Sequence, residues 1–437
     1  MKNKALWGIC GLLIFLACSF LGCNTETSGG DDPTDVIKVV SVIPKELQKT
    51  AYDDSPTVSL GANDFAFRLS AALAEQGGTK NLVCSPLSVW IPLAALANAA
   101  DDQYKAGLLT ALGIPALGDE DINNGVSRML YDLTRQRERE YYGEEHYHDP
   151  IKIANAIFVD YDVTIKGDFA QTFMDYFRGN SIKVDFLSPA AVREVNNWTK
   201  KHTNGKIPEI IQEFPPETVA VIANAIYFFD QWEWKFDPDK TKGDTFYAPE
   251  GETTAFYMLR EGDSLLYYED ENLQAMPLRF TADSGLYILL PKNGDAAGLL
   301  ASLTNAYFNE IQSASTIAKG KLLLPRFSIE GDVMSFRNIL ITLGIPLFNE
   351  YSLTGMIEET AVQLSDALHK AVIEVNEKGT TAAAVTLLQT EATSAGPWEE
   401  PEKIFEMNCN KPFVFVLYDR TYSGGAQVLF TGMVNKP

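Results

Sequence analysis

The side chains that could act as a nucleophile and a base do not fall into a recognisable catalytic pattern in this sequence. The histidines number four: His146, His148, His202 and His369. Asp283-Ser284-Gly285 superficially resembles a protease nucleophile, but it directly precedes the apolar run 286–291, where a turn is expected. The hydrolase motif GxSxG, the zinc motif HExxH and the phosphate-binding P-loop are absent. Because no nucleophile can be matched with a base, we predict that the chain is not an enzyme.

Metal-ligand chemistry is offered by His146 and His148 together with Glu144 and Glu145. They lie in the charged, aromatic stretch 135–150, which we interpret as an exposed helix end followed by a loop. Two histidines so close together in an acidic loop seldom hold a metal. No CxxC pair or zinc-type cysteine spacing is present. We therefore expect neither a metal nor another cofactor.

The most unusual segment is 371–396, AVIEVNEKGTTAAAVTLLQTEATSAG. A strand pattern over 371–376 leads into Glu377, and the next strand start is expected at Asn408; the 30 residues between them are a long connection for a compact domain. Alternate positions from Thr380 form a small, uncharged face as far as Leu388: Thr380, Ala382, Ala384 and Thr386. This pattern suits a segment able to enter a sheet as a strand. An Ala-rich helix or a flexible linker fits the composition equally well.

Helix signals are concentrated early in the chain. Phe65, Leu69 and Leu73 recur at a spacing of four, and we expect Asn63 or Asp64 to cap this helix. Ser85 as a cap and Pro86 in the first turn predict a buried helix that continues to Ala100. A shorter helix is expected over 108–112.

Strand signals dominate the later part of the chain, interleaved with turns. The β-rich runs are 151–160, 219–229, 286–291, 321–329, 371–376, 411–419 and 426–434. Several are apolar on both faces, which is typical of strands covered by helices or by a second sheet. We predict a mixed α+β fold with large sheets, in one domain.

Composition excludes some partners. Hydrophobic residues make up 46% of the 437 residues, which suffices for a large core, and the formal net charge is −22. So acidic a body is a poor candidate for nucleic acid or anionic lipid surfaces.

The N-terminus has the features of an export signal. Lys2 and Lys4 precede the apolar run 5–21, and Leu21-Gly22-Cys23 resembles the lipidation site of a bacterial lipoprotein. We predict that residues 1–22 are a lipoprotein signal peptide, that Cys23 carries lipid, and that 23–57 form a flexible tether. Cleavage at Cys18 and an ordinary signal peptide remain alternatives.

The remaining cysteines, Cys84 and Cys409, lie in apolar surroundings. We expect two buried thiols. A disulfide between them is the alternative in an exported protein.

Seven short motifs in family order identify the chain as resembling the serpins, over roughly residues 58–437. The motifs are Asn81–Val89, Asn196–Ile207, Asn224–Trp232, His369-Lys370-Ala371, Val375–Ala384, Asn410–Phe413 and Leu429–Gly432. The resemblance implies a serpin fold of about nine helices and three β-sheets, with an exposed reactive-centre loop at about 377–407. It also implies a single serpin domain over 58–437.

The resemblance further implies a suicide-substrate inhibitor of serine endopeptidases, with cysteine endopeptidases as a further option: the cleaved loop inserts into the central sheet and traps the acyl-enzyme. The hinge of that loop would comprise Glu377, Gly379, Thr380, Thr381, Ala382, Ala383 and Ala384. Counting from Glu377 places the reactive bond at Thr393–Ser394. Small neighbours, Ala392 and Ala395, favour elastase-like proteases with small pockets.

Other family positions carry over residue by residue. Ser85, Ser88, Asn224 and His369 match the shutter, a polar network beneath the opening between two central strands. Trp232, Arg326 and Glu377 match the breach, where insertion begins, and an Arg326–Glu377 pair would hold the closed state.

The segment Ser394–Phe405 departs from the family by its length and acidity, so an additional contact with the protease or a shifted cleavage point is open. The alternatives are a non-inhibitory serpin acting as a binding scaffold and a lipid-anchored surface hydrolase. We expect an exported monomer, anchored by lipid to the cell envelope, whose partner is a target endopeptidase.

Overall fold

The structure is a computed structural model. It describes residues 55–134, 137–141, 144–148, 151–349, 351–380, 404–420 and 425–437, all within the compact unit Val36–Pro437. The predicted lipidated Cys23, the signal peptide 1–22 and the reactive bond Thr393–Ser394 with Ala392 and Ala395 lie outside these residues. So do Thr381, Ala382, Ala383 and Ala384 of the hinge.

The described residues contain nine α-helices, as predicted, and one short 3₁₀ helix, Pro238–Lys240. The α-helices are α1 (Ser55–Gly77), α2 (Pro86–Leu96), α3 (Asp102–Ala111), α4 (Asp119–Thr134), α5 (Gly167–Phe177), α6 (Pro189–His202), α7 (Ala296–Ser302), α8 (Asn305–Ala314) and α9 (Arg337–Thr342). Within the described ranges, none combines the length and the apolar character that a membrane crossing needs.

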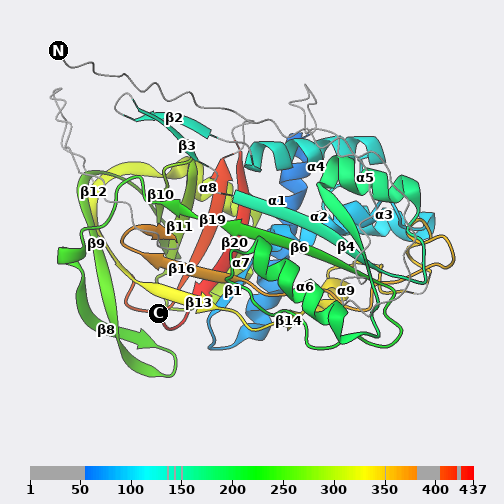
Figure 1. The fold of residues 1–437 in the computed structure, drawn as a ribbon. Helices are drawn as coiled ribbons and strands as arrows, with labels where there is room; N and C mark the ends of the chain where they lie inside the picture. Colours follow the sequence, from blue (N-terminus) through cyan, green and yellow to red (C-terminus); the bar gives the residue numbers. More distant parts are fainter. Residues whose placement is uncertain are drawn as a thin grey trace, which may run out of the picture. The chain divides into compact units, whose positions relative to one another are not determined.

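The largest sheet has nine strands, and Figure 1 shows it at the left and centre of the view. Its order is β1 (Leu82–Cys84), β20 (Ala426–Val434), β19 (Phe413–Arg420), β11 (Ser284–Pro291), β10 (Leu273–Arg279), β9 (Gly251–Glu269), β12 (Thr316–Pro325) and β18 (Ile404–Asn408), with β8 (Lys242–Ala248) also on β9. All eight residues of β11 are buried, because both of its faces are covered.

Two further sheets carry the candidate site. One has the order β5 (Gly179–Val184), β4 (Ile151–Asp160), β6 (Ala220–Phe228). The other has the order β13 (Phe327–Glu330), β16 (Val372–Asn376), β17 (Gly379–Thr380), β7 (Asp230–Gln231). Because β7 follows β6 after a single residue, the two sheets share one nearly continuous strand.

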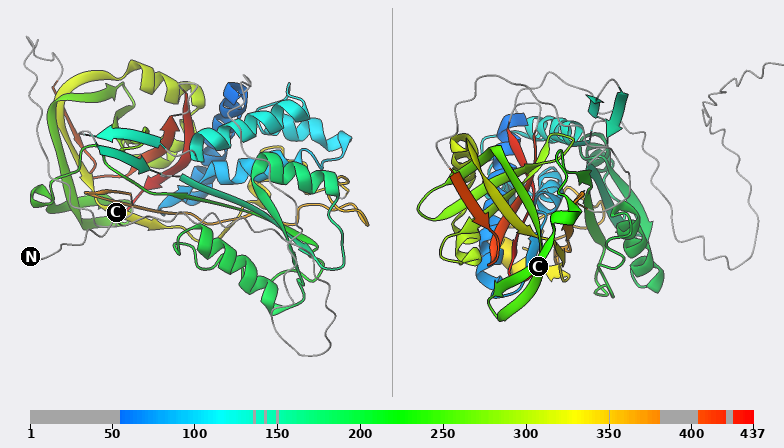
Figure 2. Two further views of the ribbon diagram at one scale, coloured as in Figure 1. Left: turned by 45° about the horizontal axis from the view of Figure 1, so that its top comes forward. Right: turned by 90° about the vertical axis from the view of Figure 1, so that its left-hand side faces the viewer.

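Helix α6 covers one face of the β5–β4–β6 sheet. Val195 and Trp198 of α6 pack on Phe158 of β4 and on Ile182 and Val184 of β5, in a core cluster separate from the main one. Figure 2 shows α6 on one side of these strands and α4 and α5 on the other. Any strand added beside β6 must therefore fit beneath α6.

The mixed α+β class is confirmed, but the first helix begins earlier than predicted. Helix α1 starts at Ser55, inside the expected tether, and Asn63 and Asp64 lie within it. Asn63 does not cap the helix. Its side chain accepts a hydrogen bond from the Val428 amide at 2.8 Å and donates to the Ala426 carbonyl at 2.6 Å.

The second helix begins at Pro86, as predicted, but Ser85 does not cap it with its side chain. The Ser85 hydroxyl instead donates to the carbonyl of Leu429 on β20 at 2.9 Å. Helix α2 ends at Leu96 rather than at Ala100. The expected helix 108–112 is the end of the longer α3.

Three further predictions also need correction. The stretch 135–150 contains a β-hairpin, β2 (Arg137–Tyr141) with β3 (Glu144–His148), rather than a helix end and a loop. The run 321–329 is divided at Arg326 between β12 and β13. Asn408 ends β18 rather than beginning a strand, because β18 pairs in parallel with β12 from Ile404 onward.

Candidate functional site

The two residues of β17 are already part of a sheet. Thr380 lies opposite Val375 of β16 on one side and Asp230 of β7 on the other. Gly379 and Thr380 are both buried. The resemblance implies an exposed loop that begins at Glu377, with Thr380 as the first residue to enter the sheet after cleavage. This expectation is wrong for Gly379 and Thr380, because both already lie in the sheet of the uncleaved chain.

Glycine is required at position 379. Its φ is +146°, and a Cβ there would collide with the carbonyl oxygen of Asp230. The close approach of β7 allows β17 to pair on both sides.

Asp230 anchors β7 to the large sheet. Its buried carboxylate accepts hydrogen bonds from the hydroxyls of Thr281 at 2.5 Å and Ser284 at 3.2 Å, and from the amide of Ala282 at 3.1 Å. Asp283, at φ 67°, completes the turn before β11. The turn predicted for Asp283-Ser284-Gly285 ends at Asp283, because Ser284 and Gly285 are already the first residues of β11. The Ser284 hydroxyl donates to the Asp230 carboxylate.

Arg326 and Glu377 form an ion pair directly before β17. The Arg326 Nε and the Thr241 hydroxyl each donate to Oε1 of Glu377 at 2.6 Å. The Glu377 side chain is 9% exposed and that of Arg326 is 46% exposed. Burial acts to raise the pKa of Glu377, but the hydrogen bonds from Arg326 and Thr241 outweigh it, and the pKa is lowered.

Trp232 holds the turn between β16 and β17. Its indole N–H donates to the Asn376 carbonyl at 2.8 Å, and its backbone amide donates to that of Lys378 at 3.0 Å. The fully buried ring stacks on Phe280 with centroids 4.3 Å apart. The three residues expected at the breach, Trp232, Arg326 and Glu377, are therefore brought together around this turn.

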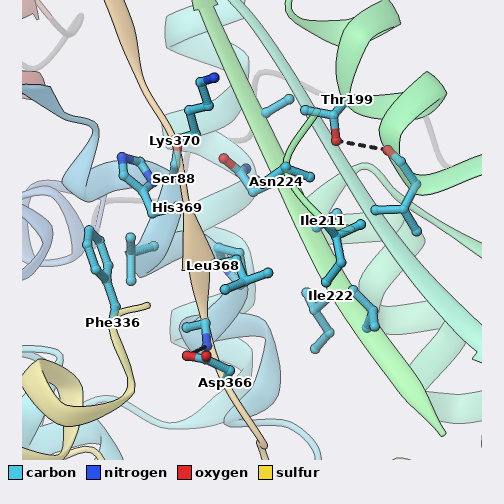
Figure 3. A pocket seen from close by; sticks show the side chains of 18 of the residues that line it. Ser88, Thr199, Ile211, Ile222, Asn224, Phe336, Asp366, Leu368, His369 and Lys370 are labelled. Atoms are coloured by element: carbon cyan, nitrogen blue, oxygen red, sulfur yellow. Dashed lines mark hydrogen bonds between the residues drawn. The ribbon is translucent and has the colours of Figure 1, made fainter. Parts of the chain in front are cut away.

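Below Thr380 the sheet is divided by a cavity of about 840 Å³, which we call the slot. Its walls are β6 on one side and residues 360–374 on the other. Among the described strands, β6 pairs with β4 alone and β16 with β13 and β17. Figure 3 shows Ile222 and Asn224 of β6 across the slot from Asp366, Leu368 and His369. Backbone edges on both walls are thus available to an additional strand.

Three of the four residues expected at the shutter form a connected polar group. The Ser85 amide donates to Nε2 of His369 at 3.1 Å, and the Ser88 hydroxyl donates to Oγ of Ser85 at 3.0 Å. Since Nε2 accepts a hydrogen bond, the proton of the neutral ring is on Nδ1. The ring also stacks on Phe336, with centroids 5.0 Å apart. Burial lowers the pKa of His369 to about 4.

Asn224 lies apart from this group, on the opposite wall of the slot. Its Nδ2 donates to Oδ1 of Asn155 on β4 at 2.7 Å. Its own Oδ1 is buried without a hydrogen-bond partner among the described residues. An unpaired buried acceptor is costly, so a donor brought into the slot would stabilise Asn224.

Both described cysteines, Cys84 and Cys409, are free and buried, as expected. Burial raises the pKa of both thiols far above the usual range, which makes them unreactive as thiolates.

Sequence reasoning missed two parts of this site. Asp230 sits inside the motif Asn224–Trp232, but its partners Thr281 and Ser284 are about 50 residues away, beyond any local spacing. The slot is also bridged by Lys206 and Glu374, at 3.4 Å. Glu374 interrupts the apolar strand 371–376, and that was the signal available in the sequence.

The chain is similar in sequence to known proteins of one family. Residues 60–437 match the family model described as Serpin (serine protease inhibitor). The chain is 27% identical over 404 residues to the plasma serine protease inhibitor of Bos taurus, covering 90% of this chain and 95% of that protein. It is 29% identical over 403 residues to an uncharacterized serpin-like protein of Thermococcus kodakarensis, covering 90% and 89%.

Solved structures show the same fold. The native thermophilic serpin tengpin superposes with a TM-score of 0.76 at 25% identity, covering 91% of this chain and 98% of that one. Thyroxine-binding globulin in complex with thyroxine gives a TM-score of 0.73 at 24% identity, covering 87% and 99%. The chain belongs to the serpin family. Members of this family are generally protease inhibitors rather than catalysts.

Proposed function

We propose that this protein inhibits serine endopeptidases as a suicide substrate, by inserting its cleaved loop into the slot. The observation that carries this proposal is β17, which is paired on both sides at the upper end of the slot. An added strand needs free backbone edges and a defined starting register. The two walls of the slot offer the edges, and β17 sets the register.

The register of β17 fits the sequence that follows it. Continuing the pairing of Thr380 with Asp230 would place Ala382 beside Phe228 and Thr390 beside Ala220, the two ends of β6. A strand of this length spans about 30 Å. Thr380 shares the buried face of Val375, which is 1% exposed, so the small face of the loop would turn toward the core. Large or charged residues on this face would prevent insertion.

The preferred targets are elastase-like proteases, since the residues around Thr393–Ser394 are small and carry no Arg or Lys. Cysteine proteases of similar specificity are further candidates. The proposed reactive bond lies three residues beyond Thr390, so the protease would be carried along the full length of β6.

The test is to mix the protein with pancreatic elastase and examine the products on an SDS gel. We expect a complex stable to SDS and a released peptide whose N-terminal residue is Ser394. Cleavage without a complex would refute the inhibitor and favour a non-inhibitory scaffold. Turnover of other substrates that persists without the loop would favour a hydrolase.

We also propose that the protein is an exported monomer that acts as a bacterial lipoprotein-type serpin, anchored through Cys23 to the cell envelope. Support comes from the basic start, the apolar run 5–21 and Leu21-Gly22-Cys23. Radiolabelled palmitate should label the wild type and not Cys23→Ala. Equal labelling of the two would refute the lipid anchor.

A further inference from the structure

The segment between α6 and β6, residues 203–219, roofs the slot. Lys206, Ile207, Ile210 and Ile211 of this segment all line the slot. One side of the roof is fastened to α6, because Oδ1 of Asn196 accepts hydrogen bonds from the amides of Ile210 at 2.9 Å and Ile211 at 3.2 Å. Since α6 packs on β4 and β5, this side of the roof is held to the β6 wall.

Lys206 attaches the roof to the opposite wall. Its Nζ lies 3.4 Å from Oε2 of Glu374 on β16, and the two side chains are 36% and 37% exposed. The Glu374 side chain points to the roofed face of β16, whereas its neighbours Ile373 and Val375 are buried on the other face, 6% and 1% exposed. The ion pair thus spans the slot immediately below β17.

The register of β17 fixes which loop residue meets this ion pair. Thr380 lies opposite Val375, so the next residue to pair, Thr381, would lie opposite Glu374. Opposite residues of an antiparallel pair share a face. Thr381 would therefore enter beneath the Lys206–Glu374 pair, and every later outward-facing residue would need room under the same roof.

We propose that the Lys206–Glu374 ion pair is a latch on the roof that must open before the loop can advance beyond Thr380, and that it slows insertion. This inference rests on the proposed inhibitory function, in which insertion competes with hydrolysis of the acyl-enzyme. A slower insertion releases more cleaved inhibitor per trapped protease. The latch therefore sets how many inhibitor molecules are consumed for each protease inhibited.

The size of the effect follows from the exposure of the pair. A half-exposed ion pair contributes modestly and is screened by salt, which corresponds to about a two- to fivefold change in rate. Lys206→Gln and Glu374→Gln should each speed insertion by this factor and lower the stoichiometry of inhibition. The charge-exchanged double variant Lys206→Glu/Glu374→Lys should restore the wild-type value.

The experiment measures the stoichiometry of inhibition of pancreatic elastase, together with amide hydrogen exchange of residues 203–219 in the uncleaved protein. Both readouts are compared at 50 and 500 mM NaCl. High salt should speed loop insertion in the wild type but not in the Gln variants. Lys105→Gln, which breaks the ion pair of Lys105 with Asp119 between α3 and α4, is the matched control and should change neither readout.

Single variants that match the wild type in both readouts would overturn the latch, as would a double variant that behaves like the singles. If the wild type forms no complex with elastase, the inhibitory function fails. Hydrogen exchange then still decides the latch: faster exchange in the single variants, reversed in the double variant, supports it, and unchanged exchange refutes it.

Discussion

Oε1 of Glu377 accepts a hydrogen bond from Nε of Arg326 at 2.6 Å, at the point where β16 turns into β17. The contact joins the end of β12 to the hinge, and the amide of Phe236 fastens the same turn by donating to the Glu377 carbonyl at 3.0 Å. The ion pair expected from the sequence is present. Mutation of Glu377 tests whether the pair holds the closed state.

Glu377→Lys should loosen the hinge. The new ammonium would face Arg326 where a nearly buried carboxylate now sits, at a cost of about 1–3 kcal/mol. We expect a lower melting temperature of the uncleaved protein and faster spontaneous loop insertion, both followed by differential scanning fluorimetry. Glu377→Gln keeps the shape and should have a smaller effect. Unchanged melting and insertion in Glu377→Lys would show that the pair does not hold the closed state.

On the proposed mechanism, Thr380→Arg should make the protein a substrate of elastase instead of its inhibitor. Thr380 is 2% exposed, and an ionised side chain cannot be buried there without a partner. Elastase should still cleave the loop. The yield of the SDS-stable complex should fall at least about tenfold, by analogy with the loss of a buried polar partner. Thr380→Ser, which keeps the small hydroxyl, serves as the control. Persistence of the complex in Thr380→Arg would contradict insertion through β17.

Gly379→Ala should expel β17 from the sheet. The added methyl would meet the Asp230 carbonyl in a backbone conformation of positive φ, with strain of about 1–3 kcal/mol. Faster hydrogen exchange of Thr380 would report the expulsion. Gly251→Ala is the matched control, since Gly251 has φ +130° but nothing within 4 Å of the added atom. If the two substitutions had equal effects, the change would come from the positive φ alone and not from the contact with the Asp230 carbonyl.

His369 should make the protein less stable in acid. The unfolded residue takes up a proton near its ordinary pKa of 6.5, whereas burial lowers the pKa in the folded state to about 4. The stabilisation given by the neutral ring is therefore complete above pH 6.5 and is lost as the pH falls toward 4, amounting to about 3 kcal/mol.

His369→Gln keeps an acceptor for the Ser85 amide and removes the titration. Melting temperatures between pH 7 and pH 4 should fall less steeply in this variant than in the wild type. The loss of carboxylate contacts such as that of Glu377 is common to both proteins and cancels in the comparison. Parallel curves would mean that His369 does not titrate as described.

Local patterns predicted much of the fold. The strand 151–160 was predicted with the bounds that β4 has, because its apolar run is bounded on both sides by turn residues. The predictions were wrong for two polar residues that make tertiary contacts. Ser85 and Asn63 have the chemistry of helix caps, but their side chains form hydrogen bonds with β20 instead. Short-range rules cannot separate these two uses of one side chain.

The sequence named some residues of the candidate site but did not predict how they are placed. The resemblance named Gly379 and Thr380, yet whether they lie inside the sheet depends on how closely β7 approaches β16. That distance is set by Asp230 and its contacts with Thr281 and Ser284. Likewise, Lys206 and Glu374 are 168 residues apart, and only the path of the chain over the slot brings them together.

The position of Gly379 and Thr380 in the sheet of the uncleaved chain has a kinetic consequence. Starting a new strand is ordinarily the slow step, since several dihedral angles are fixed before a full set of hydrogen bonds compensates for the lost entropy. In this chain that nucleus exists in the uncleaved protein. On the proposed mechanism the severed loop would begin from a register already fixed, and only the opening of the Lys206–Glu374 latch and propagation along β6 would remain.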